Sequence, residues 1–263
     1  MKTVIFTVCD QNNLKYARKL IKSFKYFHPE KDFVLFTNAK VENIPGVRIL
    51  PITSTDKDIW YKQKPYFADI LFREGYESVL GLDSDQLILG KLDYLFNTTG
   101  YDVGTVLNFN PLDFRTYGAI SVNGVHYATE YYNCGLVMMR NHKFVKHWLR
   151  LCNSKYFPRF TYKEQDLFNL ICHFGEYEVK CYDDADPDNN YFAWHGLLGS
   201  REALRMQMVN GEVYLPASPE GFPSRDIIYK VYHAGNGQTP NDKLNHRLIF
   251  NEDVADFITG ILK

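Results

Sequence analysis

The first part of this chain alternates short apolar runs with longer segments of helical periodicity. Residues 3–8 form a run of strand length, and apolar residues then recur at helical spacing over 14–27, until His28-Pro29 ends the pattern. Pro65 suits the first turn of a second helix. Further runs of strand length lie at 33–36, 47–50 and 78–82. This order predicts an α/β fold whose mostly parallel sheet binds ligands beyond the C-terminal ends of its strands.

The pattern loosens after residue 90. Strands are predicted at 103–107 and 135–139, whereas 108–127 is polar, aromatic and rich in turn residues, as is typical of a functional or mobile segment. The chain has 263 residues and 45% apolar residues, which is enough for the core of one large domain. No repeat or Gly/Ser/Pro-rich linker divides it. We therefore expect a single domain over 1–263.

Composition argues against several classes of partner. The net charge of −1 gives no electrostatic reason to expect binding to nucleic acid or to an anionic membrane. The five cysteines are an odd number, widely spaced and without a Cys-x-x-Cys pair, so we expect reduced and mostly buried thiols. The N-terminus resembles no targeting signal, and no apolar segment approaches 18 residues. We expect a cytoplasmic protein without a transmembrane segment.

The motif Asp83-Ser84-Asp85 directly follows an apolar run of strand length, and the apolar residues Leu87, Ile88 and Leu89 come soon after it. Alternation around Ser84 places both carboxylates on one side of the chain. Two such groups repel each other unless a cation joins them, and hard oxygen ligands suit Mg²⁺ or Mn²⁺, which commonly neutralise a diphosphate. The motif therefore indicates half of a metal site. The alternative interpretation is a solvated turn.

Two further polar motifs accompany predicted elements in the second part of the chain. Asn133 precedes Gly135 in a strand, which permits close approach of a ligand or marks a bulge. Glu164 and Gln165 begin a helical pattern. Thr161 and Glu164 have capping-box spacing, which would commit Glu164 to the helix end and leave the Gln165 amide for a sugar hydroxyl.

A histidine ends the last predicted strand. His233 closes the run 231–233 and is either a structural histidine or a ligand. The acidic cluster at 183–188 is a rival cation site, but Pro187 and the absence of a following apolar run favour a solvated turn there.

Taken in order, these motifs resemble the GT-A glycosyltransferases, specifically the glycogenin-like family eight of retaining enzymes. The resemblance covers roughly residues 3–240 and includes a matching lead-in to the metal motif over 64–83. The matching motifs are Asp83-Ser84-Asp85, Asn133-Cys134-Gly135, Glu164-Gln165-Asp166 with Asn169, and His233. The resemblance implies a GT-A (Rossmann-like) mixed, mostly parallel sheet with flanking helices. It also implies a nucleotide-binding half over about 1–107 and an acceptor- and sugar-binding half over about 108–263.

The resemblance assigns a role to each matched position. Asp83, Asp85 and His233 would hold Mn²⁺ (or Mg²⁺), whose mixed carboxylate and imidazole ligands are chemically reasonable. The positions that would contact the nucleotide or the donor are Thr7, Asp10, Tyr16, Lys64 and Ser84, together with the acid pair, and Tyr16 would stack on the base. The positions that would surround the anomeric carbon are Asn133, Glu164 and Gln165.

Two positions depart from the family pattern. Cys134 stands where the family often has Ala, and Gln238-Thr239-Pro240 replaces a late Lys-Pro, for which Lys243 is a candidate substitute on the diphosphate.

The implied reaction is transfer of a sugar from a nucleotide diphosphate donor, with UDP-sugar expected, to a hydroxyl of a glycan or another acceptor, with retention of configuration. Three rivals from other classes remain. A phosphatase with an aspartyl nucleophile would read Asp-x-Asp-x-Thr/Val after a strand, and Gln86 stands where Thr or Val should be. A sugar nucleotidyltransferase would need a Gly-rich loop after the first strand, and Cys9 to Asn13 contain no glycine. A non-catalytic carbohydrate-binding protein would use some of the many aromatic rings, which are equally common in cores.

Overall fold

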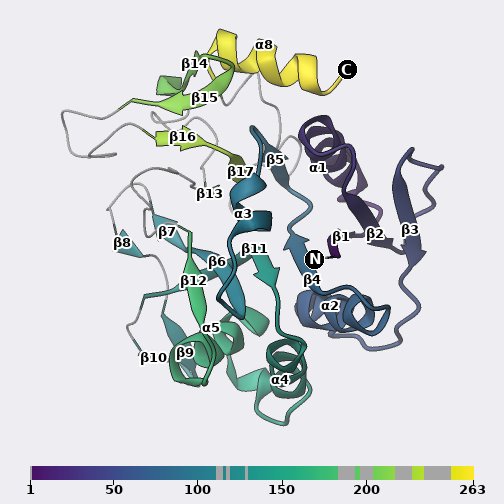
Figure 1. Ribbon diagram of the computed structural model, residues 1–263. Coiled ribbons are helices and arrows are strands. Elements are labelled where there is room, and N and C mark those ends of the chain that lie inside the picture. Colours follow the sequence, from purple (N-terminus) through teal and green to yellow (C-terminus); the bar gives the residue numbers. More distant parts are fainter. Residues whose placement is uncertain are drawn as a thin grey trace.

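The computed structural model describes residues 2–110, 115–116, 119–127, 130–182, 193–195, 204–216, 227–233 and 250–263. Its centre is a seven-stranded sheet in the order β12-β6-β11-β4-β1-β2-β3 (Figure 1). The strands are β1 (Thr3–Cys9), β2 (Asp32–Thr37), β3 (Val47–Pro51), β4 (Ser78–Leu82), β6 (Val103–Leu107), β11 (Tyr132–Met139) and β12 (Val179–Cys181).

The sheet is mixed and mostly parallel, as the sequence predicts. β1 pairs in parallel with β2 and β4, β2 with β3, and β6 with β12. β11 is the exception, because it runs antiparallel between β4 and β6. Its first residues therefore lie at the same edge of the sheet as the C-terminal end of β4.

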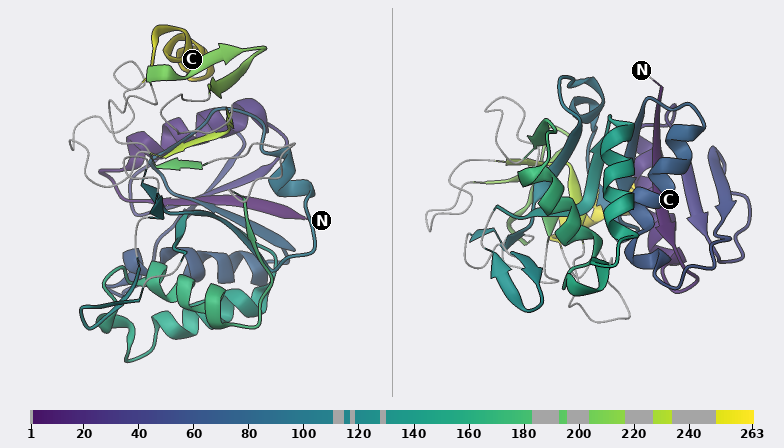
Figure 2. Two further views of the ribbon diagram at one scale, coloured as in Figure 1. Left: turned by 90° about the vertical axis from the view of Figure 1, so that its left-hand side faces the viewer. Right: turned by 90° about the horizontal axis from the view of Figure 1, so that it is seen from below.

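Helices cover both faces of the sheet (Figure 2). One face carries α1 (Leu14–Phe27), and the other carries α2 (Gln63–Arg73), α4 (His142–Cys152) and α5 (Glu164–Phe174). The alternation of side chains along β1 divides them between the layers: Ile5 packs with the α1 cluster, whereas Val4 and Phe6 pack with the opposite cluster. This is a three-layer α/β arrangement in a single domain.

Shorter elements complete the fold. A three-stranded sheet joins β13 (Ala193–His195), β17 (Val231–His233) and β5 (Gln86–Ile88), and another joins β14 (Gln207–Val209), β15 (Glu212–Leu215) and β16 (Ile227–Tyr229). Further helices in the described part of the chain include α3 (Asp93–Asn97), α8 (Glu252–Ile261) and the 3-10 helices η1 (Ile59–Tyr61) and η2 (Phe157–Arg159). The predicted irregular segment 108–127 contains β7 (Phe109–Asn110), β8 (Arg115–Thr116), β9 (Ile120–Val122) and β10 (Val125–Tyr127).

Two expectations from composition can be compared with the structure. All five cysteines are free thiols, four of them buried and Cys172 half-buried, which confirms the expectation of unpaired and mostly buried thiols. In the part of the chain that the structure describes, every helix is too short or too polar to span a bilayer.

Candidate active site

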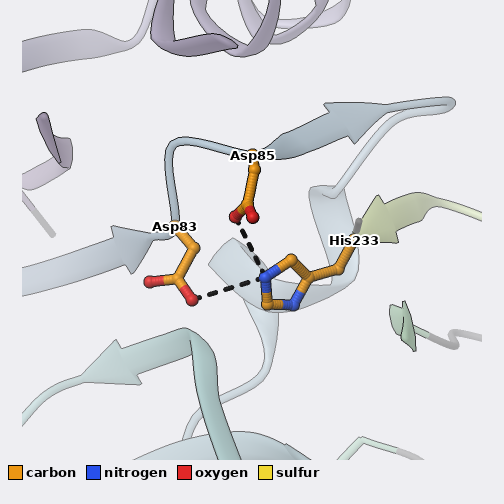
Figure 3. A group of neighbouring side chains, drawn as sticks. All are labelled: Asp83, Asp85 and His233. Atoms are coloured by element: carbon orange, nitrogen blue, oxygen red, sulfur yellow. Dashed lines mark hydrogen bonds and ion pairs between the residues drawn. The ribbon is translucent and has the colours of Figure 1, made fainter. Parts of the chain in front are cut away.

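The acid pair and the late histidine meet at the C-terminal edge of the central sheet. β4 ends at Leu82, the turn carries Asp83 and Asp85, and β5 then pairs antiparallel with β17, which places His233 opposite Gln86. Three side chains from two distant segments therefore converge on one point (Figure 3). The sequence prediction that these residues form one cluster is consistent with this geometry.

The cluster has the spacing of a cation site. Nε2 of His233 lies 3.4 Å from Oδ2 of Asp83 and 3.1 Å from Oδ1 of Asp85, and the ligand atoms of all three lie within 4.8 Å of one another. Burial alone would lower the pKa of His233, but the negative charges of Asp85 and Asp83 outweigh it and raise that pKa. Two carboxylates and an imidazole nitrogen are a donor set that fits Mn²⁺ or Mg²⁺.

Gly135 makes room for the histidine. A Cβ atom at this position would lie 2.5 Å from Cε1 and 2.7 Å from Nδ1 of His233, distances at which a real side chain would collide. The backbone of Gly135 also accepts a hydrogen bond of 2.8 Å from the N–H of Asp83. The close approach expected from the sequence is therefore made by a side chain of the site itself. The register of pairing between β11 and β6 also shifts between Asn133 and Met138, so an irregularity of the kind expected for a bulge is present in the same strand.

Lys64 places a positive charge beside the acid pair. It lies in the first turn of α2, is 4% exposed, and its ammonium group contacts Asp83. Burial would lower the pKa of Lys64, but the ion pair with Asp83 outweighs it and raises that pKa. The site therefore holds a charged lysine beside the carboxylates.

The predicted amides lie at the start of β11. Oε1 of Gln165 accepts a hydrogen bond of 3.0 Å from the backbone N–H of Cys134, which joins α5 to this strand. Oδ1 of Asn133 accepts one of 2.5 Å from Gly135, and its amide nitrogen donates to Asn108. The structure thus fixes both amides through backbone contacts at the same sheet edge as Asp83.

The capping-box prediction is wrong. Helix α5 begins at Glu164 itself, and the preceding Lys163 has a φ of 52° and provides no side-chain cap. The N–H of Thr161 donates instead to the carbonyl of Ser121 in β9 at 3.1 Å, which holds Thr161 against that strand. Asp166 takes over the stabilising role, because its carboxylate accepts 2.8 Å from the N–H of Tyr162 and 2.7 Å from Oη of Tyr131.

Glu164 is consequently not committed to a helix cap. Its side chain is half-buried, and burial raises its pKa to about 8, while Lys64 partly opposes the shift and Asp83 adds to it. At neutral pH this carboxyl group is mainly protonated.

The positions predicted to bind the nucleotide lie around the end of β1. Thr7 is buried and donates 2.9 Å to the carbonyl of Leu82, and Asp10 accepts hydrogen bonds from the backbone and side chain of Asn13. Tyr16 is 3% exposed and packs in an apolar cluster with β5, β15 and α8, so its ring faces are covered in this structure. Ser84 is half-buried between the two aspartates. The nucleotide-binding roles of these residues stay predictions.

Other predicted positions lie outside the described residues. These are Gln238-Thr239-Pro240, Lys243 and the acidic cluster at 183–188.

Gln86 is a site residue to which the sequence assigns no role. It lies opposite His233 and is completely buried, and among the described residues neither atom of its side-chain amide has a hydrogen-bond partner. The available signal was a glutamine between Asp85 and the apolar run that starts at Leu87. Buried polar atoms without partners are unusual in folded proteins, so each one calls for a physical explanation.

No family model matches the chain, and no curated protein matches it. Among solved structures, the bifunctional glycosyltransferase WbbM matches with a TM-score of 0.60 and 17% identity over 99% of this chain. The chain spans about half of WbbM, 49% of its length. An active-site mutant of the galactosyltransferase LgtC matches with a TM-score of 0.54 and 17% identity, over 98% of this chain and 95% of LgtC.

At these identities the likeness concerns the arrangement of the backbone. Both neighbours are glycosyltransferases, and both align over nearly the whole of this chain. Together with the mixed seven-stranded sheet and its flanking helices, the matches establish that this chain has the GT-A fold of glycosyltransferases.

Proposed function

We propose that the protein is a metal-dependent glycosyltransferase that moves a sugar from a nucleotide diphosphate donor, UDP-sugar in particular, to a hydroxyl of a glycan or another acceptor. The observation that carries this proposal is the convergence of Asp83, Asp85 and His233 at the C-terminal edge of a GT-A sheet. In open α/β sheets that edge is where ligands bind.

The three converging side chains would hold Mn²⁺ or Mg²⁺. A divalent ion bound there supplies stabilisation for the negative charge that develops on a departing diphosphate. Lys64 adds a fixed positive charge beside Asp83, and its burial keeps that charge poorly screened by water. These residues would hold and neutralise the diphosphate without an acid to protonate the leaving group.

The nucleoside would occupy the region after β1, where Thr7, Asp10 and Tyr16 lie, with Ser84 close to the phosphates. Stacking of Tyr16 on a base requires that the side chains now covering its ring move aside, since the residue is 3% exposed. A pyrimidine is the proposed base, as the resemblance to the glycogenin-like family implies.

We propose retention of configuration. An inverting enzyme needs a general base opposite the leaving group, and the amides of Asn133 and Gln165 cannot take a proton at neutral pH. Glu164, whose pKa burial raises to about 8, is mainly protonated at that pH. LgtC has been crystallised as an active-site mutant in which a glutamine is replaced by glutamate, which supports an active-site role for a glutamine in this fold.

A donor screen tests the proposal. Purified protein is incubated with Mn²⁺ and each of a set of UDP-, GDP- and CDP-sugars, and release of nucleotide diphosphate is measured. We expect release from a UDP-sugar that EDTA abolishes and Mn²⁺ restores. NMR of the product's anomeric centre then reports the stereochemistry, with an α-linked product expected from an α-linked donor.

The matched variant for this screen is Asp85→Asn, which removes one charge at nearly constant volume. It is expected to lose most of the Mn²⁺-dependent turnover and to keep the melting temperature of the metal-free protein. Full activity of this variant with an unchanged metal requirement would contradict the proposal that Asp85 binds the metal ion. Pyrophosphate-dependent release of a sugar phosphate would indicate nucleotidyl transfer in place of glycosyl transfer.

A further inference from the structure

One segment of this nearly neutral chain is strongly basic. Residues 131–163 contain no aspartate or glutamate, although the whole chain has 31 acidic residues and a net charge of −1. The segment carries seven basic residues, namely Arg140, Lys143, Lys146, Arg150, Lys155, Arg159 and Lys163. The proposed catalytic site neither uses nor explains this concentration of charge.

Five of these seven side chains are exposed, three of them on helix α4. Helix α4 buries Phe144, Val145 and Trp148 against the core, so its basic residues face outward. We define the basic stripe as the five exposed cations of α4 and the η2 region, which are Lys143, Lys146, Arg150, Lys155 and Arg159. Arg140 does not belong to it, because its guanidinium donates to backbone carbonyls of Leu95 and Phe96.

Exposed tyrosines accompany the basic stripe. Tyr61, Tyr156 and Tyr162 are 53%, 48% and 44% exposed. The Lys155 ammonium and the Arg159 guanidinium lie 5.2 and 5.3 Å from the ring centroid of Tyr156. Both cations lie over this ring, where they can hold an anionic group, and the exposed rings of Tyr61 and Tyr162 can support the flat face of a sugar.

The stripe ends at the proposed catalytic site. Because β11 runs antiparallel to β4, α4 starts at the far end of the sheet and returns toward the edge that carries Asp83. Its last turns are tied to the start of α5, where the indole N–H of Trp148 donates 2.9 Å to the carbonyl of Glu164. Lys62 and Lys163 both lie over the ring of Phe157, which joins the η1 and η2 regions directly before Lys64 and Glu164.

We propose that the basic stripe and its tyrosines bind the acceptor, and that the acceptor is a saccharide carrying carboxylate or phosphate groups. This inference rests on the proposed glycosyl transfer and names its acceptor class. Complementary charge draws a polyanionic chain to the stripe, and the tyrosines next to the site stack on its sugar rings.

An anionic membrane is the rival partner for a basic amphipathic helix. A helix that lies in a membrane exposes Leu, Phe or Trp for insertion. In segment 131–163 the exposed large apolar side chains are tyrosines alone, and α4 buries its Phe144 and Trp148. The surface therefore fits a sugar chain better than a lipid layer.

Charge reversal at Lys146, Arg150 and Arg159 to glutamate tests this inference. Binding of three probes is measured by calorimetry at 50 and 200 mM salt: a galacturonate hexamer, phosphorylated maltohexaose and unmodified maltohexaose. The wild-type protein is expected to bind the two anionic probes at least about tenfold more tightly than maltohexaose, with affinity that falls with salt. The triple variant should lose that preference. Binding of one anionic probe alone would distinguish carboxylate from phosphate recognition.

The matched control reverses three exposed cations elsewhere, Arg18, Lys40 and Lys91, to glutamate. It makes the same change in net charge and should leave anionic binding within about twofold of wild type. Equal loss in both variants would overturn the inference, because binding would then follow net charge alone. Loss in the triple variant of binding to phosphatidylglycerol vesicles, without saccharide binding by wild type, would overturn it in favour of a membrane.

The thermal shift produced by UDP with Mn²⁺ is recorded for every variant. The basic stripe lies outside the cation cluster, so this shift should be the same in wild type and in the triple variant. Selective binding of anionic saccharides without any nucleotide shift would contradict the proposed transferase and leave the saccharide surface intact. A normal nucleotide shift without selective binding of anionic saccharides would contradict only the proposal that the basic stripe binds the acceptor.

Discussion

His233 reaches the acid pair because residue 135 has no side chain. Gly135→Ala would place a Cβ 2.5 Å from the imidazole, which must rotate or retreat from the aspartates. We predict that this variant folds but binds Mn²⁺ at least about tenfold more weakly, as second-shell changes at metal sites commonly do. Titration followed by the electron paramagnetic resonance signal of free Mn²⁺ measures the change.

The control for this variant is Gly260→Ala in helix α8. A Cβ there meets no atom within 4 Å, so Mn²⁺ affinity should remain that of wild type. If Gly135→Ala also bound Mn²⁺ like wild type, the imidazole would not be a ligand.

The buried Gln86 amide should cost stability in the metal-free protein. Replacing it by leucine of similar size removes two polar atoms without partners. We predict that Gln86→Leu raises the free energy of unfolding by about 1 kcal/mol in the absence of metal and nucleotide, as measured by urea denaturation. A lower free energy of unfolding would mean that the amide already stabilises the folded protein through a bound molecule.

Glu164 should make stability depend on pH. Its pKa rises from an ordinary value of 4.5 to about 8 on folding, so between these values the folded protein holds a proton that the unfolded chain has lost. The stability that this proton contributes is complete below pH 4.5 and is lost as pH rises toward 8, at most about 1.4 kcal/mol per pH unit.

Glu164→Gln should remove that part of the pH dependence. Urea denaturation of both proteins at pH 5 and pH 8 is the measurement, and the variant is expected to gain stability relative to wild type at pH 8. An unchanged difference between the two proteins across this range would show that the carboxyl group titrates normally.

At the scale of the element, Asp166 holds the start of α5 against β9 and β11. Asp166→Ala would leave the buried hydroxyl of Tyr131 and the N–H of Tyr162 without their acceptor. The loss of a buried network of this kind typically lowers the free energy of unfolding by about 2–4 kcal/mol. Asp166→Asn retains one acceptor oxygen and should recover part of that loss in the same denaturation experiment; equal losses would mean that charge alone matters.

The elements that could be predicted from the sequence are those with strong local signals. Residues 3–8 and 78–82 are mostly apolar runs of strand length, and the helix at 14–27 has clear periodicity, so each appears in the structure close to its predicted bounds. Strands of two or three residues, such as β8 and β9, are too short to produce a period. The capping prediction at Thr161 is wrong because the N–H of Thr161 donates to the carbonyl of Ser121, 40 residues earlier in the chain. This long-range hydrogen bond overrides the local capping preference.

At the scale of the whole molecule, the candidate site depends on topology that no local pattern contains. Asp85 and His233 are 148 residues apart, and they meet because β5 and β17 pair in one small sheet at the edge of the large one. The acid pair could be predicted from its strand, and the histidine only from the order of motifs. Gln86 was missed because its burial becomes visible only when β17 is placed beside it.

In the proposed function, a divalent ion joins Asp83, Asp85 and His233 to a nucleotide diphosphate. A crystal structure of the protein with Mn²⁺ and UDP, with the anomalous signal of manganese recorded, tests it most directly. We predict one manganese peak coordinated by the three side chains and by oxygens of both phosphates. Manganese bound elsewhere, or UDP bound at this edge of the sheet with no metal at the three side chains, would contradict it.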